Sequence, residues 1–195
     1  MSDGVLLDAT AGLSRDQLIR WLGDAAKLWL AHDGLWFRAV ESVGGLEEAI
    51  RRDEAAMSAW TVLEAKRIRE RLSLPSDGGL GALETALQAR LYALLNRQSI
   101  RREGERLIFT MHTCRVQDAR NRQGLAPFPC RSVGLPEYAG FAATIDPRLV
   151  VTCRHCPPDQ TPAGEWCSWE FSVRGDEESR SLVGRVSQKG RTFGP

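Results

Sequence analysis

The stretch that decides the fold lies in the C-terminal half of the chain, at residues 148–173, RLVVTCRHCPPDQTPAGEWCSWEFSV. Alternating apolar and polar residues predict one strand over 148–153 and another over 165–173. The Pro-rich loop between them predicts that the two strands form a β-hairpin. Residues 106–114, RLIFTMHTC, have the same period and predict a third strand.

The N-terminal half has a helical period instead. Ser14 and Gln17 have the spacing of a capping box, and apolar residues then recur at helical spacing as far as Trp29. We expect residues 32–34, His-Asp-Gly, to interrupt this helix, with Asp33 capping the segment that follows. Gly44-Gly45 is expected to end that second segment.

Three more helices are expected. One is long and covers 46–72, with Glu64 and Arg67 at ion-pair spacing, and the next covers 80–96. A short helix over 135–145 is expected to begin at Leu135-Pro136, because proline suits a first helical turn.

These elements predict an α+β fold in which a helical layer packs on a small, mostly antiparallel sheet. Residues 1–174 are expected to form a single domain, with the helical part over 14–97 and the sheet with the cysteines over 98–174. Residues 175–195 are polar and Gly-rich, and we expect a tail there with one marginal strand at 182–186.

Composition excludes several classes of protein. The 195 residues contain 26 basic and 25 acidic side chains, which argues against nucleic acid as a partner. No apolar run approaches the roughly 20 residues that span a bilayer, and the N-terminus lacks the pattern of a signal peptide. We therefore expect a cytoplasmic protein without a membrane partner. A long amphipathic helix with several tryptophans is compatible with a homodimer.

The five cysteines are the strongest functional signal. All lie between residues 114 and 167, and an odd number in a cytoplasmic chain argues against a disulfide framework. Four thiolates suit a tetrahedral zinc or an iron–sulfur cluster, of which we favour the cluster. Thiols that act without a metal, and cysteines that only fill the core, are the alternatives. The candidate metal ligands are Cys114, Cys130, Cys153, Cys156 and Cys167.

Other polar residues are candidates for catalysis or for substrate binding. His112 lies two residues before Cys114 on one strand, so the two form a candidate nucleophile pair, and His32 is a third candidate at the helical side. A small acidic substrate would be held by arginines near the cysteines, which otherwise form a solvated face; the candidates are Arg115, Arg120 and Arg148.

Two long strings in the chain resemble an uncharacterised family of bacterial and archaeal cytosolic proteins, a domain of unknown function. The strings are residues 32–68, from HDGLWF to EAKRI, and residues 114–171, from CRVQD to CSWEF.

The chain also resembles, more distantly, the L-2-amino-thiazoline-4-carboxylate hydrolase-like family. That resemblance rests on Cys114, on the motif GLPE at 134–137 and on the pattern around Cys167, Trp169 and Phe171. It implies hydrolysis of a small sulfur- or nitrogen-containing heterocycle. This chain departs from the pattern of that family by adding Cys130 and the Cys153/Cys156 pair.

Three functions follow as expectations. The first is a metal-binding protein, with the ion or cluster on four of the five cysteines, that acts on a small acidic substrate. The second is a hydrolase of a thiazoline-like ring that uses Cys114 or a metal-bound water as nucleophile. The third is a non-catalytic module in which a structural zinc stabilises the sheet.

Overall fold

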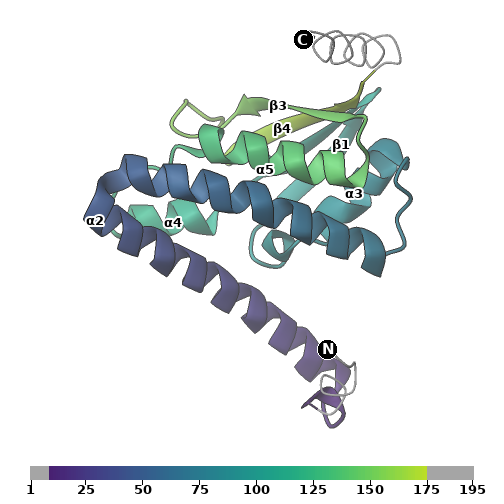
Figure 1. Ribbon diagram of the computed structural model, residues 1–195, viewed down its shortest axis with the longest axis horizontal. Helices are drawn as coiled ribbons and strands as arrows, with labels where there is room; N and C mark the ends of the chain where they lie inside the picture. The colour runs from purple at the N-terminus through teal and green to yellow at the C-terminus, as the bar shows by residue number, and fades with distance from the viewer. Residues whose placement is uncertain (1–8, 175–195) are drawn as a thin grey trace, which may run out of the picture.

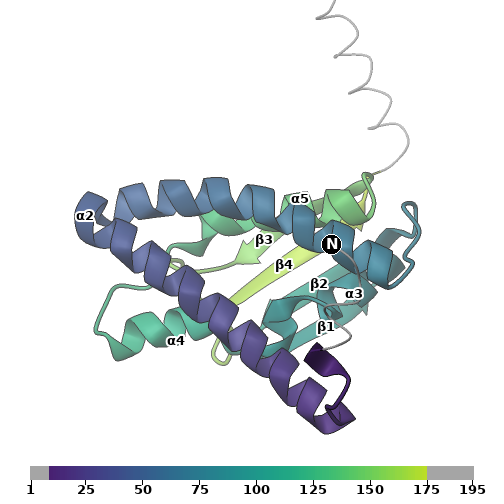
Figure 2. The ribbon, with the colours of Figure 1, turned by 60° about the horizontal axis from the view of Figure 1, so that its bottom comes forward.

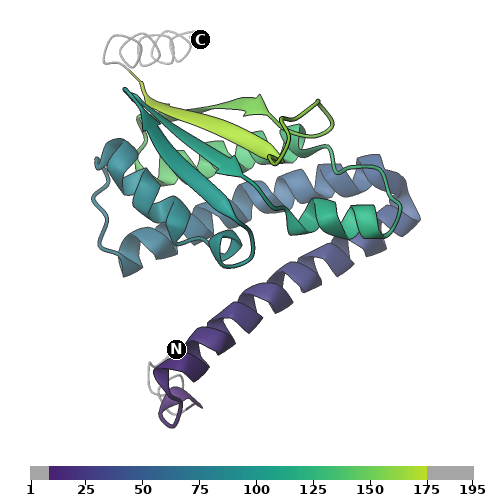
Figure 3. The same ribbon diagram turned by 180° about the vertical axis from the view of Figure 1, so that it is seen from behind.

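The computed structural model describes residues 9–174, which form an α+β fold with helices stacked on one face of a four-stranded sheet (Figures 1 and 3). This confirms the predicted fold class. The expected tail at 175–195 and its marginal strand lie outside this part of the chain. The elements are α2 Arg15–Arg71, α3 Gly79–Gln88, the 3-10 helix η1 Leu91–Leu94, β1 Gln98–Glu103, β2 Arg106–Met111, α4 Arg115–Arg122, α5 Cys130–Ile145, β3 Leu149–His155 and β4 Cys167–Val173.

The sheet has the strand order β1-β2-β4-β3, and each neighbouring pair is antiparallel. Phe109 on β2 lies opposite Trp169 on β4, and Met111 lies opposite Cys167. These four side chains therefore lie on the same face of the sheet. The hairpin of β3 and β4 is present as predicted, with an irregular register between Cys153 and His155.

Helix α2 is bent sharply at Gly45 into two arms, residues 15–44 and residues 46–71 (Figure 1). Gly45 has φ 79° and ψ 172°, a conformation that is essentially restricted to glycine. The capping box of Ser14 and Gln17 is present at the start of the helix. The expected interruption at 32–34 is wrong, because the helix continues through Gly34, whose cost inside a helix is only about 1 kcal/mol.

The second arm packs along α5, whereas the first arm extends away from the sheet and helices (Figures 1 and 2). The first arm contacts the rest of the fold through aromatic side chains from its middle onward. Trp29 stacks on Trp60 with ring centroids 4.8 Å apart, and Phe37 meets Phe128 edge-on at 5.4 Å. Apolar side chains near the start of this arm, such as Trp21 and Leu22, stay about half exposed. No helix within residues 9–174 is long and apolar enough to cross a membrane.

The core fills the space between the sheet, the second arm of α2, α3 and α5. Its largest side chains, including Leu83, Phe109, Phe141 and Phe171, are at most 1% exposed. Burial of this kind contributes roughly 1.5–3 kcal/mol for each large apolar side chain. The core therefore fixes the sheet and α5, whose ends carry most of the cysteines.

Two elements were not predicted because they contain almost no apolar residues. Strand β1, QSIRRE, has Ile100 as its only apolar residue, as is common for an edge strand. Helix α4, RVQDARNR, was interpreted only as a basic run. Its presence ends the preceding strand at Met111, so Cys114 is the N-cap of a helix and not the last residue of a strand.

Two helix boundaries also differ from the prediction. Helix α5 begins at Cys130 rather than at Leu135, and Pro136 lies inside it. The helix expected over 80–96 ends at Gln88 and is followed by the separate turn η1. Cys130 is therefore the first residue of a helix.

Candidate functional site

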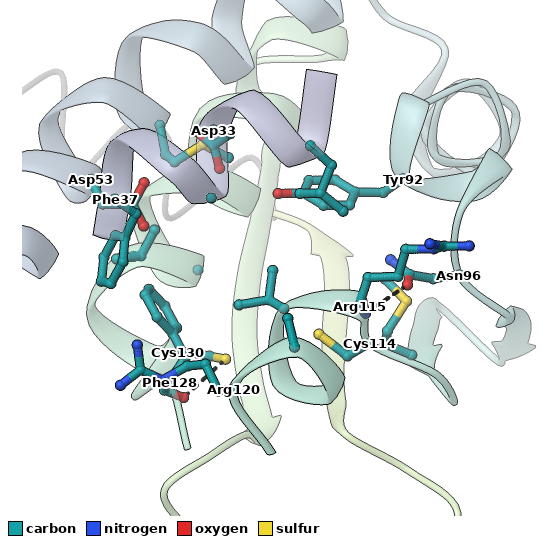
Figure 4. A pocket seen from close by; sticks show the side chains of 18 of the residues that line it. Asp33, Phe37, Asp53, Tyr92, Asn96, Cys114, Arg115, Arg120, Phe128 and Cys130 are labelled. Atoms are coloured by element: carbon teal, nitrogen blue, oxygen red, sulfur yellow. Dashed lines mark hydrogen bonds between the residues drawn. The ribbon is translucent and has the colours of Figure 1, made fainter. Parts of the chain in front are cut away.

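A cavity of about 520 Å³ lies between the two arms of α2, helices α4 and α5 and the start of β4 (Figure 4). Most of its wall is apolar, with Phe37, Met57, Phe128 and Val133 among the lining side chains. Small-molecule sites typically have volumes of about 300–1,000 Å³, with apolar walls and a few polar groups. The cavity has the size and the character of such a site.

Three of the five cysteines line this cavity, and each stands at the end of an element. Cys114 is the N-cap of α4, Cys130 is the first residue of α5, and Cys167 is the first residue of β4. Figure 4 shows Cys114 beside Asn96 and Arg115, and Cys130 beside Phe128 and Arg120. Three different elements thus each contribute one cysteine to the wall of the same cavity.

Burial raises the pKa of all three thiols in the cavity. At Cys167 the indole of Trp169 opposes the rise, and the charges of Cys130, Cys114 and Cys156 add to it. Burial thus disfavours the thiolate form of all three side chains.

Cys153 and Cys156 form a separate pair that does not line the cavity. Their sulfur atoms are 3.4 Å apart, where β3 ends and the Pro157-Pro158 loop begins. The loop is joined to the cavity wall by one backbone hydrogen bond, in which the N–H of Cys130 donates to the Pro157 carbonyl at 2.9 Å.

The geometry divides the five thiols into a group of three and a pair. Across residues 9–174, no three or more His, Cys, Asp or Glu side chains are grouped so that they could hold a metal ion. The donor set remains chemically suited to a soft metal or a cluster. The metal site predicted from the sequence therefore stays a prediction.

Two carboxylates also face the cavity, Asp33 from the first arm of α2 and Asp53 from the second (Figure 4). The Tyr92 hydroxyl points into the cavity on the same side. Within the described part of the chain, these three polar groups have no hydrogen-bond or ion-pair partner. They are therefore available to a ligand.

The carboxylates of Asp33 and Asp53 are partly buried, so water solvates them poorly. Burial raises the pKa of Asp33, and the nearby His32 opposes the rise. Burial, followed by the charges of Asp33 and Glu137, raises the pKa of Asp53 to about 7. Asp53 can therefore accept or donate a proton near neutral pH.

A buried ionic network lies behind this part of the wall. The Arg90 guanidinium donates to Glu64 at 2.8 Å and to Glu137 at 2.6 Å, and its central carbon is 4.7 Å from the Phe141 ring centroid. Glu64 also accepts from the backbone N–H of Leu91 at 3.1 Å. The network joins α2, α5 and the start of η1, and so fixes the elements that carry Tyr92 and Glu137.

Comparison with known proteins places the chain in a family. The model of the family of unknown function DUF6125 matches residues 11–173. The chain belongs to this family. No curated protein matches the sequence. Membership of DUF6125 agrees with the predicted resemblance to an uncharacterised domain, and it assigns no activity.

In this DUF6125 chain the two candidate histidines do not line the cavity. His112 is hydrogen-bonded through Nε2 to Ser99 Oγ at 2.8 Å and through Nδ1 to the Gly164 carbonyl at 3.1 Å. His32 packs edge-on against the ring of Trp36. Of the candidate catalytic residues Cys114, His112 and His32, the structure places only Cys114 in the cavity wall.

The candidate arginines are also separated. Arg115 and Arg120 lie on α4 and line the cavity, but Arg120 is already paired with Glu41, at 3.2 Å. The Nε of Arg115 donates to the Leu95 carbonyl. Arg148 does not line the cavity and is bound to Asp146. The three arginines are thus not brought together as one clamp.

Sequence reasoning missed the carboxylates and the network behind them. Asp33 was expected to be a helix cap, and Glu64 was expected to pair with Arg67, whereas Glu64 pairs with Arg90. A usable signal was present in the second arm of α2, where Asp53 and Glu64 fall on the same face as Met57 and Ile68. Acidic residues on an otherwise apolar face are seldom buried without a specific role.

Proposed function

We propose that the cavity binds a small organic molecule with a cationic N–H group, such as a protonated amine or an amidine. The observation that carries this proposal is the placement of Asp33, Asp53 and the Tyr92 hydroxyl, without protein partners, in one mostly apolar cavity. Buried polar groups are normally hydrogen-bonded, so acceptors left free in a cavity favour a ligand that donates hydrogen bonds. A positive charge on the ligand would also offset the repulsion between the two carboxylates.

Asp53 supports a catalytic role at this site. A carboxyl group with a pKa of about 7 exchanges protons readily at neutral pH, as a general acid or base must. The thiols of Cys114, Cys130 and Cys167 form another part of the same wall. We therefore propose proton transfer to or from the bound molecule, with Asp53 as the group that exchanges the proton.

The proposal is tested with three small probes of nearly the same shape: benzamidine, benzamide and benzoate. Isothermal titration calorimetry at pH 8 should detect binding of the cation benzamidine and much weaker binding of the neutral and anionic probes. Asp33→Asn and Asp53→Asn should each weaken benzamidine binding by about tenfold or more, because a charged hydrogen bond contributes roughly 1.5–3 kcal/mol. Asp16→Asn, on the exposed start of the same helix, is the matched control. Equal affinity for all three probes, or an unchanged affinity in both variants, would refute the proposal.

A metal-binding role is the second candidate, and the convergence of the thiols favours it. Three cysteines share the cavity wall, and the charge of Cys156 also acts on Cys130 and Cys167. Four of the five cysteines would hold an iron–sulfur cluster or a zinc ion.

Anaerobic purification, a visible spectrum and elemental analysis test this metal-binding role. Broad visible absorption with iron and sulfide indicates a cluster, and stoichiometric zinc without colour indicates zinc. Protein that carries neither metal under anaerobic conditions would refute it.

The distant resemblance adds a more specific form of the proposed activity, the hydrolysis of a thiazoline-like ring. Burial raises the pKa of Cys114, so its thiol would need to lose a proton before it could attack such a ring. Ring opening that survives in Cys114→Ser would exclude Cys114 as the nucleophile and leave a metal-bound water as the alternative.

A further inference from the structure

The pair of cysteines outside the cavity has a geometry of its own. The Cys153 and Cys156 sulfurs are 3.4 Å apart, and a disulfide needs them at about 2.05 Å, so a small rotation of the side chains brings them into bonding distance. The register of β3 is irregular between Cys153 and His155, and a turn follows in which the N–H of Asp159 donates to the Cys156 carbonyl at 3.0 Å. Both cysteines are present as thiols.

The two sulfurs differ in their access to solvent. Cys156 is completely buried, whereas Cys153 is partly exposed. An external reagent therefore meets the Cys153 sulfur first, with the Cys156 sulfur behind it.

A positive charge lies beside the pair. Arg131, in the first turn of α5, forms an ion pair with Asp159, and its charge acts on both sulfurs. The exposure of Cys153 and the close spacing of the two sulfurs therefore combine at one place outside the cavity.

We propose that Cys153 and Cys156 form a redox-active dithiol that exchanges with low-molecular-weight disulfides. The Cys153 thiolate attacks one sulfur of the disulfide, forms a mixed disulfide and releases one thiolate. The Cys156 sulfur then attacks the Cys153 sulfur, which forms the internal disulfide and releases the second thiolate. The two protons of the dithiol pass to the two released thiolates. The protein loses two electrons, and the external disulfide gains them as two thiols.

The dithiol is linked to the cavity, although this inference does not depend on the proposed ligand. The carbonyl of Pro157, directly after Cys156, accepts the backbone N–H of Cys130 at 2.9 Å. Cys130 begins α5 and lines the cavity. The disulfide would thus form one residue away from a backbone contact that positions the cavity wall.

The test uses the full chain, reduced and then equilibrated without oxygen in glutathione disulfide. Free thiols are trapped with N-ethylmaleimide, and the intact mass is measured. The expected product has lost two hydrogen atoms and carries three maleimide groups on its five cysteines. Trypsin cleaves after Arg154, so residues 149–154 should be found disulfide-linked to residues 155–174. An excess of reduced glutathione should restore all five thiols.

Serine variants identify the two sulfurs and their order. Cys153→Ser and Cys156→Ser should both abolish the internal disulfide, and Cys156→Ser should accumulate a glutathione adduct on Cys153. Cys114→Ser is the matched control and should still lose two hydrogens. Three results would each overturn the proposal: five alkylated cysteines after oxidation, a link that survives in Cys156→Ser, or a stoichiometric zinc that blocks oxidation until a chelator removes it.

Discussion

The Arg90 guanidinium donates a hydrogen bond of 2.6 Å to Glu137, and both side chains are almost completely buried. This ion pair joins the residue before η1 to the middle of α5 behind the cavity wall. Burial raises the pKa of Glu137, and Arg90 opposes the rise. A buried carboxylate of this kind depends on its cation.

Arg90→Met should therefore destabilise the protein by about 3–5 kcal/mol at pH 7.5, because it leaves Glu64 and Glu137 buried without a positive charge. The loss should shrink as the pH falls, since the folded variant would then bind protons on these carboxyl groups more tightly than the unfolded chain. Urea unfolding at several pH values measures both effects. Arg67→Met, at an exposed position of α2, should cost less than about 0.5 kcal/mol. Similar losses for the two variants would contradict this account of the network.

Asp53 should make the stability of the protein depend on pH in the opposite way to an ordinary ion-paired carboxylate. Its pKa is raised from 3.8 to about 7 in the folded protein, so the folded state binds the proton more tightly than the unfolded chain. The stabilising contribution is complete below about pH 4 and is lost as the pH rises through 7.

Asp53→Asn should therefore be more stable than the parent protein at pH 8 by about 1–2 kcal/mol. A pKa shift of this size corresponds to about 4 kcal/mol of unfolding free energy. The effect on stability is smaller because water partly solvates the Asp53 carboxylate. The difference should disappear near pH 4. Urea unfolding between pH 4 and pH 8 measures it, with Asp16→Asn as an exposed control that should follow the parent at each pH. A destabilised Asp53→Asn at pH 8 would show that this carboxylate is paired.

The elements with strong apolar periodicity could be predicted from the sequence, whereas those fixed by tertiary contacts could not. The second arm of α2 and the strands β2, β3 and β4 carry regular apolar patterns and were anticipated. Strand β1 and helix α4 are polar, and contacts with the rest of the fold hold them in place. The path of the first arm depends on the backbone conformation of one residue, Gly45, and on the stacking of Trp29 with Trp60.

The same distinction applies to the site. Cysteine spacing indicated a convergence of thiols, and three of them share one cavity. The pairing of Glu64 with Arg90 spans 26 residues, and Asp33 and Asp53 line the same cavity only because α2 folds back on itself. Neither relationship has a local pattern in the sequence.

Gly134 on α5 is required by the close approach of Trp169. A Cβ atom at this position would lie 2.7 Å from one ring carbon of Trp169 and 2.8 Å from another. Gly134→Ala should therefore destabilise the protein by about 1–3 kcal/mol, although alanine favours a helix. Gly23→Ala is the matched control in α2, where nothing lies within 4 Å of the added atom, and it should stabilise the protein by up to about 1 kcal/mol. Thermal unfolding of both variants measures the contrast, and a stabilised Gly134→Ala would mean that the indole has room to move.

Asp146 connects the end of α5 to the start of α3 and should stabilise the protein at neutral pH. Its carboxylate accepts from Arg148 at 2.7 Å and from the backbone N–H of Gly79 at 2.9 Å, and its side chain is fully buried. The hydrogen bond from Arg148 is the main reason why the pKa of Asp146 is lowered to about 2. The folded state thus binds the proton less tightly than the unfolded chain, so the stabilising contribution is present above pH 3.8 and is lost as the pH falls through 2.

Asp146→Asn should cost about 1–2 kcal/mol at pH 7, and the difference from the parent protein should narrow below about pH 4 and vanish near pH 2. Urea unfolding across this range measures the effect. Asp159→Asn, which removes an exposed partner of Arg131, should change the stability by less than about 0.5 kcal/mol. A cost for Asp146→Asn that stays constant from pH 7 to pH 2 would show that the negative charge of Asp146 does not carry the stabilisation.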